Sequence, residues 1–185
     1  MSDLTTVANV VKYLGLNDTA ATAADALLTR LLHAASAFIE SNMGRIFEIT
    51  AYTEVRSGKG ERFITFSDYP VQSVQSVMID GRDIPQSNGW GQPGYTFDDT
   101  RLTIQGNWFV RGMLNIELIY TAGYPTIPYE VEQACIDLVC RKYKERDRIG
   151  VNSKIINGET IVFSKTDMTD ELKSVLRAYQ KVVPI

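Results

Sequence analysis

The side chains of this sequence that could take part in catalysis are few, and none stands beside a suitable partner. His33 is the single histidine. No serine or cysteine in a recognisable nucleophile motif accompanies it, so we interpret it as a structural or surface residue. Asp98 and Asp99 are adjacent carboxylates. Neighbouring residues of a strand point to opposite faces, so this pair suits acid–base chemistry poorly, and we expect a turn at 98–100.

The segment Ser57-Gly58-Lys59-Gly60 has the composition of a phosphate-binding loop. The spacing of a Walker motif is absent, however, and the segment joins two predicted strands instead of a strand and a helix. We expect a hairpin loop at this place. With no nucleophile beside a base, no metal cluster and no cofactor loop, the sequence predicts a protein that is not an enzyme and that binds no cofactor.

The two cysteines, Cys135 and Cys140, lie on one predicted helix. Five positions along a helix separate two side chains by about 140° around the axis, so a disulfide between them is disfavoured. Two cysteines and one histidine also do not complete a structural zinc site without carboxylates. We expect free thiols in a reducing compartment.

A basic run ends the same predicted helix. Residues 141–148 hold five basic and two acidic side chains. Contact with nucleic acid is one interpretation. Cations that complement the helix dipole on a solvated face are another, and pairing with acidic residues of a neighbouring subunit is a third. The basic side chains are Arg141, Lys142, Lys144, Arg146 and Arg148.

The composition fits an ordinary folded protein. The chain has 185 residues, 44% hydrophobic and 22% charged, and a formal net charge of −3. That length suits one domain, or one domain with a sizeable insertion. The acidic balance argues against a general polyanion binder, so any DNA contact would have to be local. The N-terminus lacks the basic and apolar regions of a signal peptide, and no run approaches the roughly 20 apolar residues of a membrane span, so we expect no membrane partner.

Apolar residues with a helical period occur at both ends of the chain, whereas strand and turn signals fill the middle. The helices are expected at about 6–14, 23–43, 129–146 and 169–181. We therefore predict an α+β protein that is mainly α. Its expected form is a bundle of four or more helices, with a β-rich subdomain inserted between the second and third helices. The expected domains are a helical bundle of residues 1–46 and 121–185 and an inserted β subdomain of residues 47–120.

Turns divide the β-rich middle. Asp80-Gly81 is the strongest short turn signal of the sequence. A second turn region is expected at 106–112. Trp90 and Trp108 also lie in turn-rich segments, where aromatic residues serve protein interfaces or fill a small core, and both alternatives stay open. The expected strands cover residues 51–56, 62–66, 74–79, 82–84, 95–97, 101–104 and 114–120.

Two further segments carry more apolar residues than solvated loops do. Residues 154–163 are expected to form a hairpin, or to pack on a neighbouring subunit or on the insertion. The C-terminal residues after Lys181 form an apolar tail. The interaction residues expected in these two segments are Ile155, Ile156, Ile161, Val162, Phe163, Val182, Val183 and Ile185.

The order of these elements, together with several local strings, resembles the head–tail connector (adaptor) proteins of tailed bacteriophages. The likeness covers nearly the whole chain, and its motifs are structural. As in that family, the TAGY stretch leads through a proline into the third helix. The strings are residues 27–44 (LLTRLLHAASAFIESNMG), 69–74 (YPVQSV) leading into Ile79-Asp80-Gly81, 120–124 (YTAGY), and Ile127-Pro128 followed by 131–135 (VEQAC).

The resemblance implies a subunit that assembles into a ring at the phage neck, between the portal and the tail. Such a ring docks beneath the portal after DNA packaging, extends the DNA channel and receives the next neck or tail-completion protein. Its expected symmetry is the portal's twelvefold one. Genomic DNA would be a passing, weakly bound strand, and the protein would be found in the virion neck, and in the host cytoplasm during assembly. The family shares no catalytic residues.

Two other functions compete with this one. The first is a nucleic-acid-binding module that uses the basic end of the third helix, and the second is an enzyme with an unrecognised site. Only the connector is expected to form rings.

Overall fold

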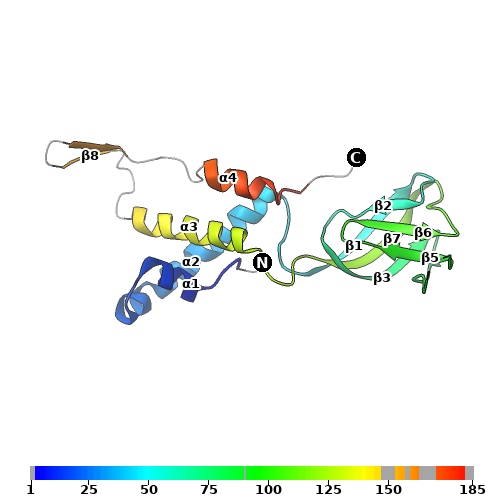
Figure 1. Ribbon diagram of the computed structural model, residues 1–185, viewed down its shortest axis with the longest axis horizontal. Coiled ribbons are helices and arrows are strands. Elements are labelled where there is room, and N and C mark those ends of the chain that lie inside the picture. Colours follow the sequence, from blue (N-terminus) through cyan, green and yellow to red (C-terminus); the bar gives the residue numbers. More distant parts are fainter. Residues whose placement is uncertain (1–2, 90, 147–152, 157–158, 163–169, 182–185) are drawn as a thin grey trace. The chain divides into compact units, whose positions relative to one another are not determined.

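The computed structural model describes residues 3–89, 91–146, 153–156, 159–162 and 170–181 (Figure 1). The chain divides into two compact units. The helical unit comprises Met1–Gly44 and Ile127–Gln180, and the β unit comprises Arg45–Thr126 and Lys181–Ile185. The chain therefore passes from one unit to the other three times.

The first two helices begin and end where local residues satisfy the free backbone groups. In α1 (Val7–Leu14) the Thr6 side chain accepts a hydrogen bond from the Asn9 N–H, and in α2 (Asp18–Met43) Asn17 accepts one from the Ala20 N–H. Gly15 and Gly44 end these helices, each with φ +66°, a backbone conformation that favours glycine. Residues 18–22, which precede the helix expected at 23–43, are the first turns of α2, because the cap at Asn17 starts the helix earlier.

The helical unit is organised around α3 (Tyr129–Glu145), which contacts α1, α2 and α4 (Asp170–Arg177). One apolar face of α3 is buried. Its members are Val131, Ala134, Cys135, Leu138 and Val139, and they share the interior with Leu28, Leu32 and Ile39 of α2 and with Leu176 of α4. No described helix combines the length and the apolar character needed to cross a bilayer.

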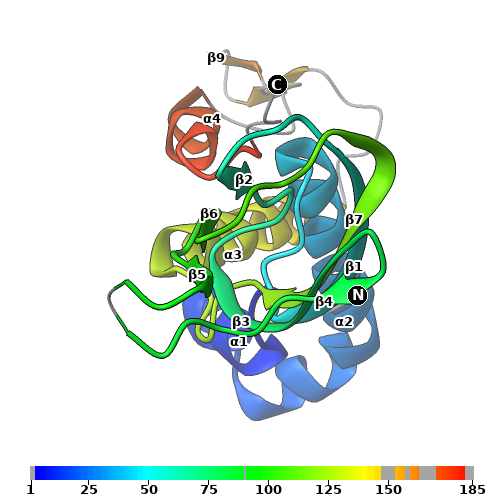
Figure 2. The same cartoon turned by 90° about the vertical axis from the view of Figure 1, so that its right-hand side faces the viewer.

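The β unit contains two antiparallel sheets, which Figure 2 shows as two layers. One has the order β1-β7-β3-β4 and the other the order β2-β6-β5. The first consists of β1 (Thr50–Gly58), β7 (Gly112–Ala122), β3 (Val71–Ile79) and β4 (Arg82–Asp83), and the second of β2 (Phe63–Thr65), β6 (Arg101–Gln105) and β5 (Gly94–Phe97).

Both sheets contribute to one apolar core. Val77, Ile116 and Leu118 come from the larger sheet, and Leu102 and Ile104 from the smaller one. Phe66, Phe109 and Tyr120 complete its large fully buried side chains. Full burial of one such side chain contributes about 1.5–3 kcal/mol, so this core gives the β unit a source of stability that does not depend on the helices.

The expected turns of the β unit are present. Asp80 and Gly81 join β3 to β4 in a hairpin. The Asp98 side chain accepts hydrogen bonds from the Thr100 and Arg101 N–H groups at 2.8 and 2.7 Å and so fixes the turn between β5 and β6. A third hairpin, expected at 154–163, pairs β8 (Ser153–Ile156) with β9 (Glu159–Val162) in the helical unit.

The expected hairpin around Ser57–Gly60 is wrong. β1 pairs with β7, with Thr50 opposite Ala122, and β2 pairs with β6, with Phe63 opposite Thr103. The two strands that flank the loop therefore belong to different sheets. Pairing partners are selected by contacts between distant parts of the chain, which the loop sequence does not encode.

The expected mainly helical bundle is also wrong. Among the described residues, strands hold nearly as many residues as helices. Two of the four helices, α1 and α4, have only eight residues each. The β part is a two-sheet structure with a core of its own, so the chain is a mixed fold rich in sheet. Helical periodicity extends over long windows, whereas several of the strands have only two to five residues. Sequence patterns therefore overstate the helical share of this chain.

Candidate interaction surfaces

The residues considered above for catalysis or metal binding have structural roles in the part of the chain that the structure describes. His33 lies on the surface, with Nδ1 2.7 Å from the Asp3 carboxylate. Hydrogen bonds from backbone N–H groups, above all that of Thr100, lower the pKa of Asp98 and hold it as a turn-forming carboxylate. Within the described ranges, no group of three or more His, Cys, Asp or Glu side chains could hold a metal ion.

Both cysteines are buried free thiols, as expected. Burial raises the pKa of Cys135 to about 11, and the neighbouring Ser36 hydroxyl lies 3.6 Å from its sulfur. A thiol that stays protonated is a poor nucleophile, so Cys135 serves the packing between α2 and α3.

The helical unit carries a groove of about 980 Å³ between α1, α3 and α4. Exposed aromatic rings line it, namely Tyr13 and Tyr129, which are 57% and 82% exposed. Its charged lining residues are four acidic and two basic, so the groove is acidic overall. These residues are Glu130, Glu132, Asp137, Glu145, Arg141 and Lys144.

Three carboxylates of this acidic groove accept hydrogen bonds from neutral donors. The Tyr179 hydroxyl donates to Glu130 at 2.7 Å. Thr5 and Asn9 donate to Glu132 at 2.9 and 2.8 Å. Gln133 donates to Asp137 at 2.9 Å. Neutral donors position these carboxylates and leave their negative charge in place, which makes the groove receptive to cationic side chains.

The basic end of α3 does not form one positive surface. Arg141 and Lys144 line the acidic groove. Lys142 borders a separate apolar hollow of about 170 Å³ on α2 and α3. Arg146 lies over the Tyr143 ring, 4.0 Å from its centre, and donates to the Tyr143 carbonyl. Arg148 lies outside the described residues. Successive helix positions thus distribute these cations over different faces.

A second surface lies at the end of the β unit where β1 ends and β7 begins. We call residues 57–63 and 108–114 the β tip. Its two segments are joined by pairing of Gly58 with Gly112 and by a bridge between Glu61 and Phe109. Large apolar side chains are exposed on it: Met113 is 88% exposed, Leu114 65% and Trp108 50%, with Val110 and Phe63 above 40%. Several large apolar side chains exposed within two paired segments are a feature of interaction sites.

Three of the four charged side chains of the β tip are basic. The Arg62 guanidinium lies over the Trp108 ring, 4.2 Å from its centre, and Arg111 Nε donates to the Lys59 carbonyl at 3.1 Å. Glu61 is the acidic one, and Asp80 borders the β tip through a hydrogen bond from Asn115. Of the aromatic residues in the turn-rich segments, Tyr95 and Phe109 fill the core and Trp108 is exposed, whereas Trp90 lies outside the described residues.

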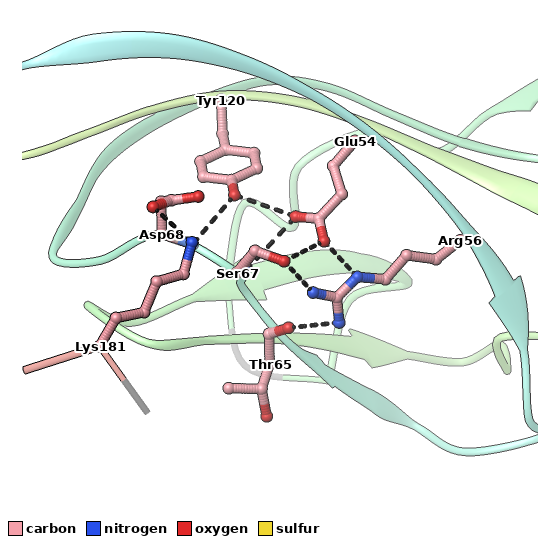
Figure 3. Close-up of polar contacts among 7 residues, drawn as sticks. All are labelled: Glu54, Arg56, Thr65, Ser67, Asp68, Tyr120 and Lys181. Atoms are coloured by element: carbon pink, nitrogen blue, oxygen red, sulfur yellow. Dashed lines mark hydrogen bonds and ion pairs between the residues drawn. The ribbon is translucent and has the colours of Figure 1, made fainter. Parts of the chain in front are cut away.

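The β unit also holds a polar network that the sequence did not indicate (Figure 3). Arg56 donates to Glu54, Ser67 and the Thr65 carbonyl, and the Ser67 hydroxyl donates to Glu54 at 2.6 Å. The Tyr120 hydroxyl donates to Glu54 at 2.9 Å and accepts from the Asp68 N–H. Burial, followed by the nearby Glu54 charge, raises the pKa of Tyr120. This network thus connects separate segments of the β unit by hydrogen bonds.

The chain end joins the β unit next to this network. Lys181 Nζ lies 2.9 Å from an Asp68 carboxylate oxygen, and both side chains are largely shielded from solvent. The expected tail residues Val182, Val183 and Ile185 follow this ion pair and lie outside the described residues, as does Phe163. Ile155 and Ile156 belong to β8, and Ile161 and Val162 to β9. The interaction role of these residues stays a prediction.

Arg45 is a buried cation at the start of the β unit. Its guanidinium lies 4.6, 5.3 and 5.6 Å from the ring centres of Tyr69, Tyr124 and Phe47, and it donates to the Tyr69 carbonyl. Aromatic faces attract a desolvated guanidinium, so this cage fixes the first residues of the unit. No local pattern predicts this cage, since Tyr69 and Tyr124 come from segments distant from Arg45 in the sequence.

The comparisons with known proteins concern nearly the whole chain. Two solved structures, titled as the neck of an empty gene transfer agent particle computed with C6 symmetry and as the virion of the native gene transfer agent particle, each match with a TM-score of 0.57. Their identities are 20% and 17%, and each alignment covers 97% of this chain and 90% of the other. At this identity the similarity is one of fold. No curated protein matches the chain.

The family assignment comes from the sequence of almost the entire chain. The head completion protein family matches residues 3–182, which include both units and the described part of α4. This match confirms the resemblance to phage head–tail connectors drawn from the sequence strings. The chain belongs to the head completion protein family.

Proposed function

We propose that this protein is a structural component of a phage-like virion neck, where its copies form a ring between the portal and the tail. The observation that carries the proposal is the family match over residues 3–182. The shared fold of chains from a gene transfer agent neck and virion, over 97% of this chain, supports it. In this role the protein extends the DNA channel and offers a docking platform to the next neck or tail-completion protein.

The described surfaces suit such a role. A closed ring uses a heterologous interface, in which two different faces of the subunit meet. The acidic groove and the apolar, basic β tip are two such unlike faces. Neither needs a small ligand, and the buried thiols and hydrogen-bonded carboxylates serve structure instead of reaction.

The number of subunits is part of the proposal. By resemblance to connectors, we infer twelve copies that match the portal. The related particle neck was computed with sixfold symmetry, and twelve copies are compatible with that symmetry because six divides twelve. Mass measurement of the assembled ring on its portal counts the copies directly.

The test combines light scattering with negative-stain imaging of the purified protein, alone and with its cognate portal. The proposal expects rings on the portal, whether or not free subunits are monomeric. A chain that never joins a circular assembly when the portal is present would overturn the proposal. Tight binding of DNA at physiological salt by such a monomer would favour the nucleic-acid-binding alternative, and substrate turnover would favour an enzyme.

A further inference from the structure

The β tip exposes apolar side chains that contribute little to the stability of the folded subunit. Met113 and Leu114 are 88% and 65% exposed, and they add almost nothing to the core of the β unit. Leu114 also has φ +50°, in the left-handed region that side chains other than glycine rarely adopt. Its N–H donates to the Ser57 hydroxyl at 3.0 Å, a bond that a glycine would make equally well. An exposed and strained leucine points to a role outside the subunit.

The acidic groove of the helical unit has the complementary character. It offers exposed tyrosines, an exposed valine (Val175, 37%) and an excess of carboxylates, whereas the β tip offers apolar side chains and an excess of cations. Arginine paired with tyrosine and carboxylate groups is typical of the central contacts of protein interfaces.

We infer that the β tip of one copy docks into the acidic groove of a second copy. Met113, Leu114 and Trp108 lie against Tyr129 and Tyr13 of that copy, and Arg62 and Arg111 meet its Glu130 and Asp137. The interface is head to tail, because each subunit contributes its β tip to one neighbour and its groove to the other. This inference rests on the proposed ring and names the surfaces that close it.

Crosslinking tests which surfaces meet. Both native cysteines are buried, so a maleimide reagent reacts with introduced surface cysteines. The double variant Met113→Cys/Tyr129→Cys, treated with a short bismaleimide in the presence of the portal, is expected to give a ladder of covalent multimers. Each single variant gives dimers at most. The control pair Ile49→Cys/Tyr129→Cys, with Ile49 outside the β tip and 44% exposed, is expected to give no ladder.

A mixing experiment tests the head-to-tail geometry. Met113→Ser/Leu114→Gly removes the apolar β tip and relieves the left-handed residue, and Tyr129→Ser/Glu130→Gln weakens the groove while keeping an acceptor for Tyr179. Each variant alone is expected to lose rings, with self-association at least about tenfold weaker. In an equal mixture, the intact groove of the first variant binds the intact β tip of the second. Each pair of subunits then has one working interface, so heterodimers form and rings do not. The variant Ile49→Ser assembles like wild type.

The outcomes separate this inference from the proposed function. Rings formed by Met113→Ser/Leu114→Gly at wild-type concentrations, or no ladder from Met113→Cys/Tyr129→Cys in rings that do form, would overturn the docking inference and leave the neck role standing. Absence of rings from the wild-type protein on its portal would overturn the neck role itself.

Discussion

The backbone of Leu114 is strained, although its side chain is mostly exposed to solvent. Leu114 has φ +50° and a side chain that is 65% exposed. Strain of this kind costs about 1–2 kcal/mol, whereas a glycine in its place loses about 0.5–1 kcal/mol through the greater freedom of the unfolded chain. The difference favours glycine at this position.

We therefore expect Leu114→Gly to raise the free energy of unfolding by about 0.5–1 kcal/mol and to weaken ring formation. Urea unfolding checks the first effect and light scattering the second. Leu114→Val, a β-branched substitution in the same conformation, is the matched control and should lower the stability. A destabilised Leu114→Gly protein would show that this leucine supports the fold.

Cys135, too, affects stability: it makes the free energy of unfolding depend on pH in the alkaline range. Burial raises the pKa of its thiol from 9.0 to about 11. Between these values the folded state keeps the proton and the unfolded state has lost it. The stabilisation that the protonated thiol provides is therefore complete below pH 9. It declines as the pH rises to 11, which lowers the free energy of unfolding by roughly 2–3 kcal/mol. Unfolding curves for the wild type and Cys135→Ala should converge over this window, and parallel curves would contradict the assignment.

The elements show which parts of the fold a sequence can predict. Local signals act through neighbouring residues: Thr6 caps α1, Gly44 ends α2, and Asp98 forms the turn expected at 98–100. Each of these depends on neighbouring residues alone. The pairing of β1 with β7 brings Thr50 opposite Ala122, and no local pattern encodes such a distant partner.

The candidate surfaces were harder to predict for a related reason. Met113 and Leu114 have the composition of core residues, and only the fold reveals that they are exposed. The acidic groove gathers Tyr13 with α3 and α4 residues from a distant part of the chain. The basic run 141–148 was visible in the sequence, but the helix turns its side chains toward different surroundings.

The β8–β9 hairpin is expected to need a partner. A two-stranded hairpin is marginally stable in water, and β8 and β9 form a sheet of only two strands. Deletion of residues 154–163 should leave the melting temperature of the subunit nearly unchanged, because the cores of both units remain. We expect the deletion to impair ring assembly on the portal, as seen by negative stain. Intact rings would show that the hairpin contacts no neighbouring subunit.

For the whole molecule, the net charge bears on the contact with DNA that the proposed function implies. The chain carries a formal net charge of −3, and the cations at the end of α3 are divided between separate surfaces. A protein in the proposed role must let a polyanion slide, so we expect weak DNA binding that is lost as salt rises. Fluorescence anisotropy with a labelled duplex, over a series of salt concentrations, measures this. Tight binding at physiological salt would contradict it.

The C-terminal tail is expected to serve docking to the portal. Truncation after Lys181 removes the apolar residues 182–185 and keeps the ion pair with Asp68. This shortened protein should remain soluble with an unchanged melting temperature and bind the portal more weakly. Lys181→Ala, which breaks the ion pair and keeps the tail, is the companion variant. Unchanged portal affinity after truncation would count against the tail.

The pairing of β1 with β7 has a consequence for how such a protein can vary. Because Thr50 lies opposite Ala122, the segment that leaves the helices and the segment that returns to them are hydrogen-bonded neighbours. A short turn grafted between Thr50 and Ala122 could therefore replace the residues between them without stretching the chain. The part of the β unit beyond this strand pair can therefore change in length while the helices keep their own buried interior.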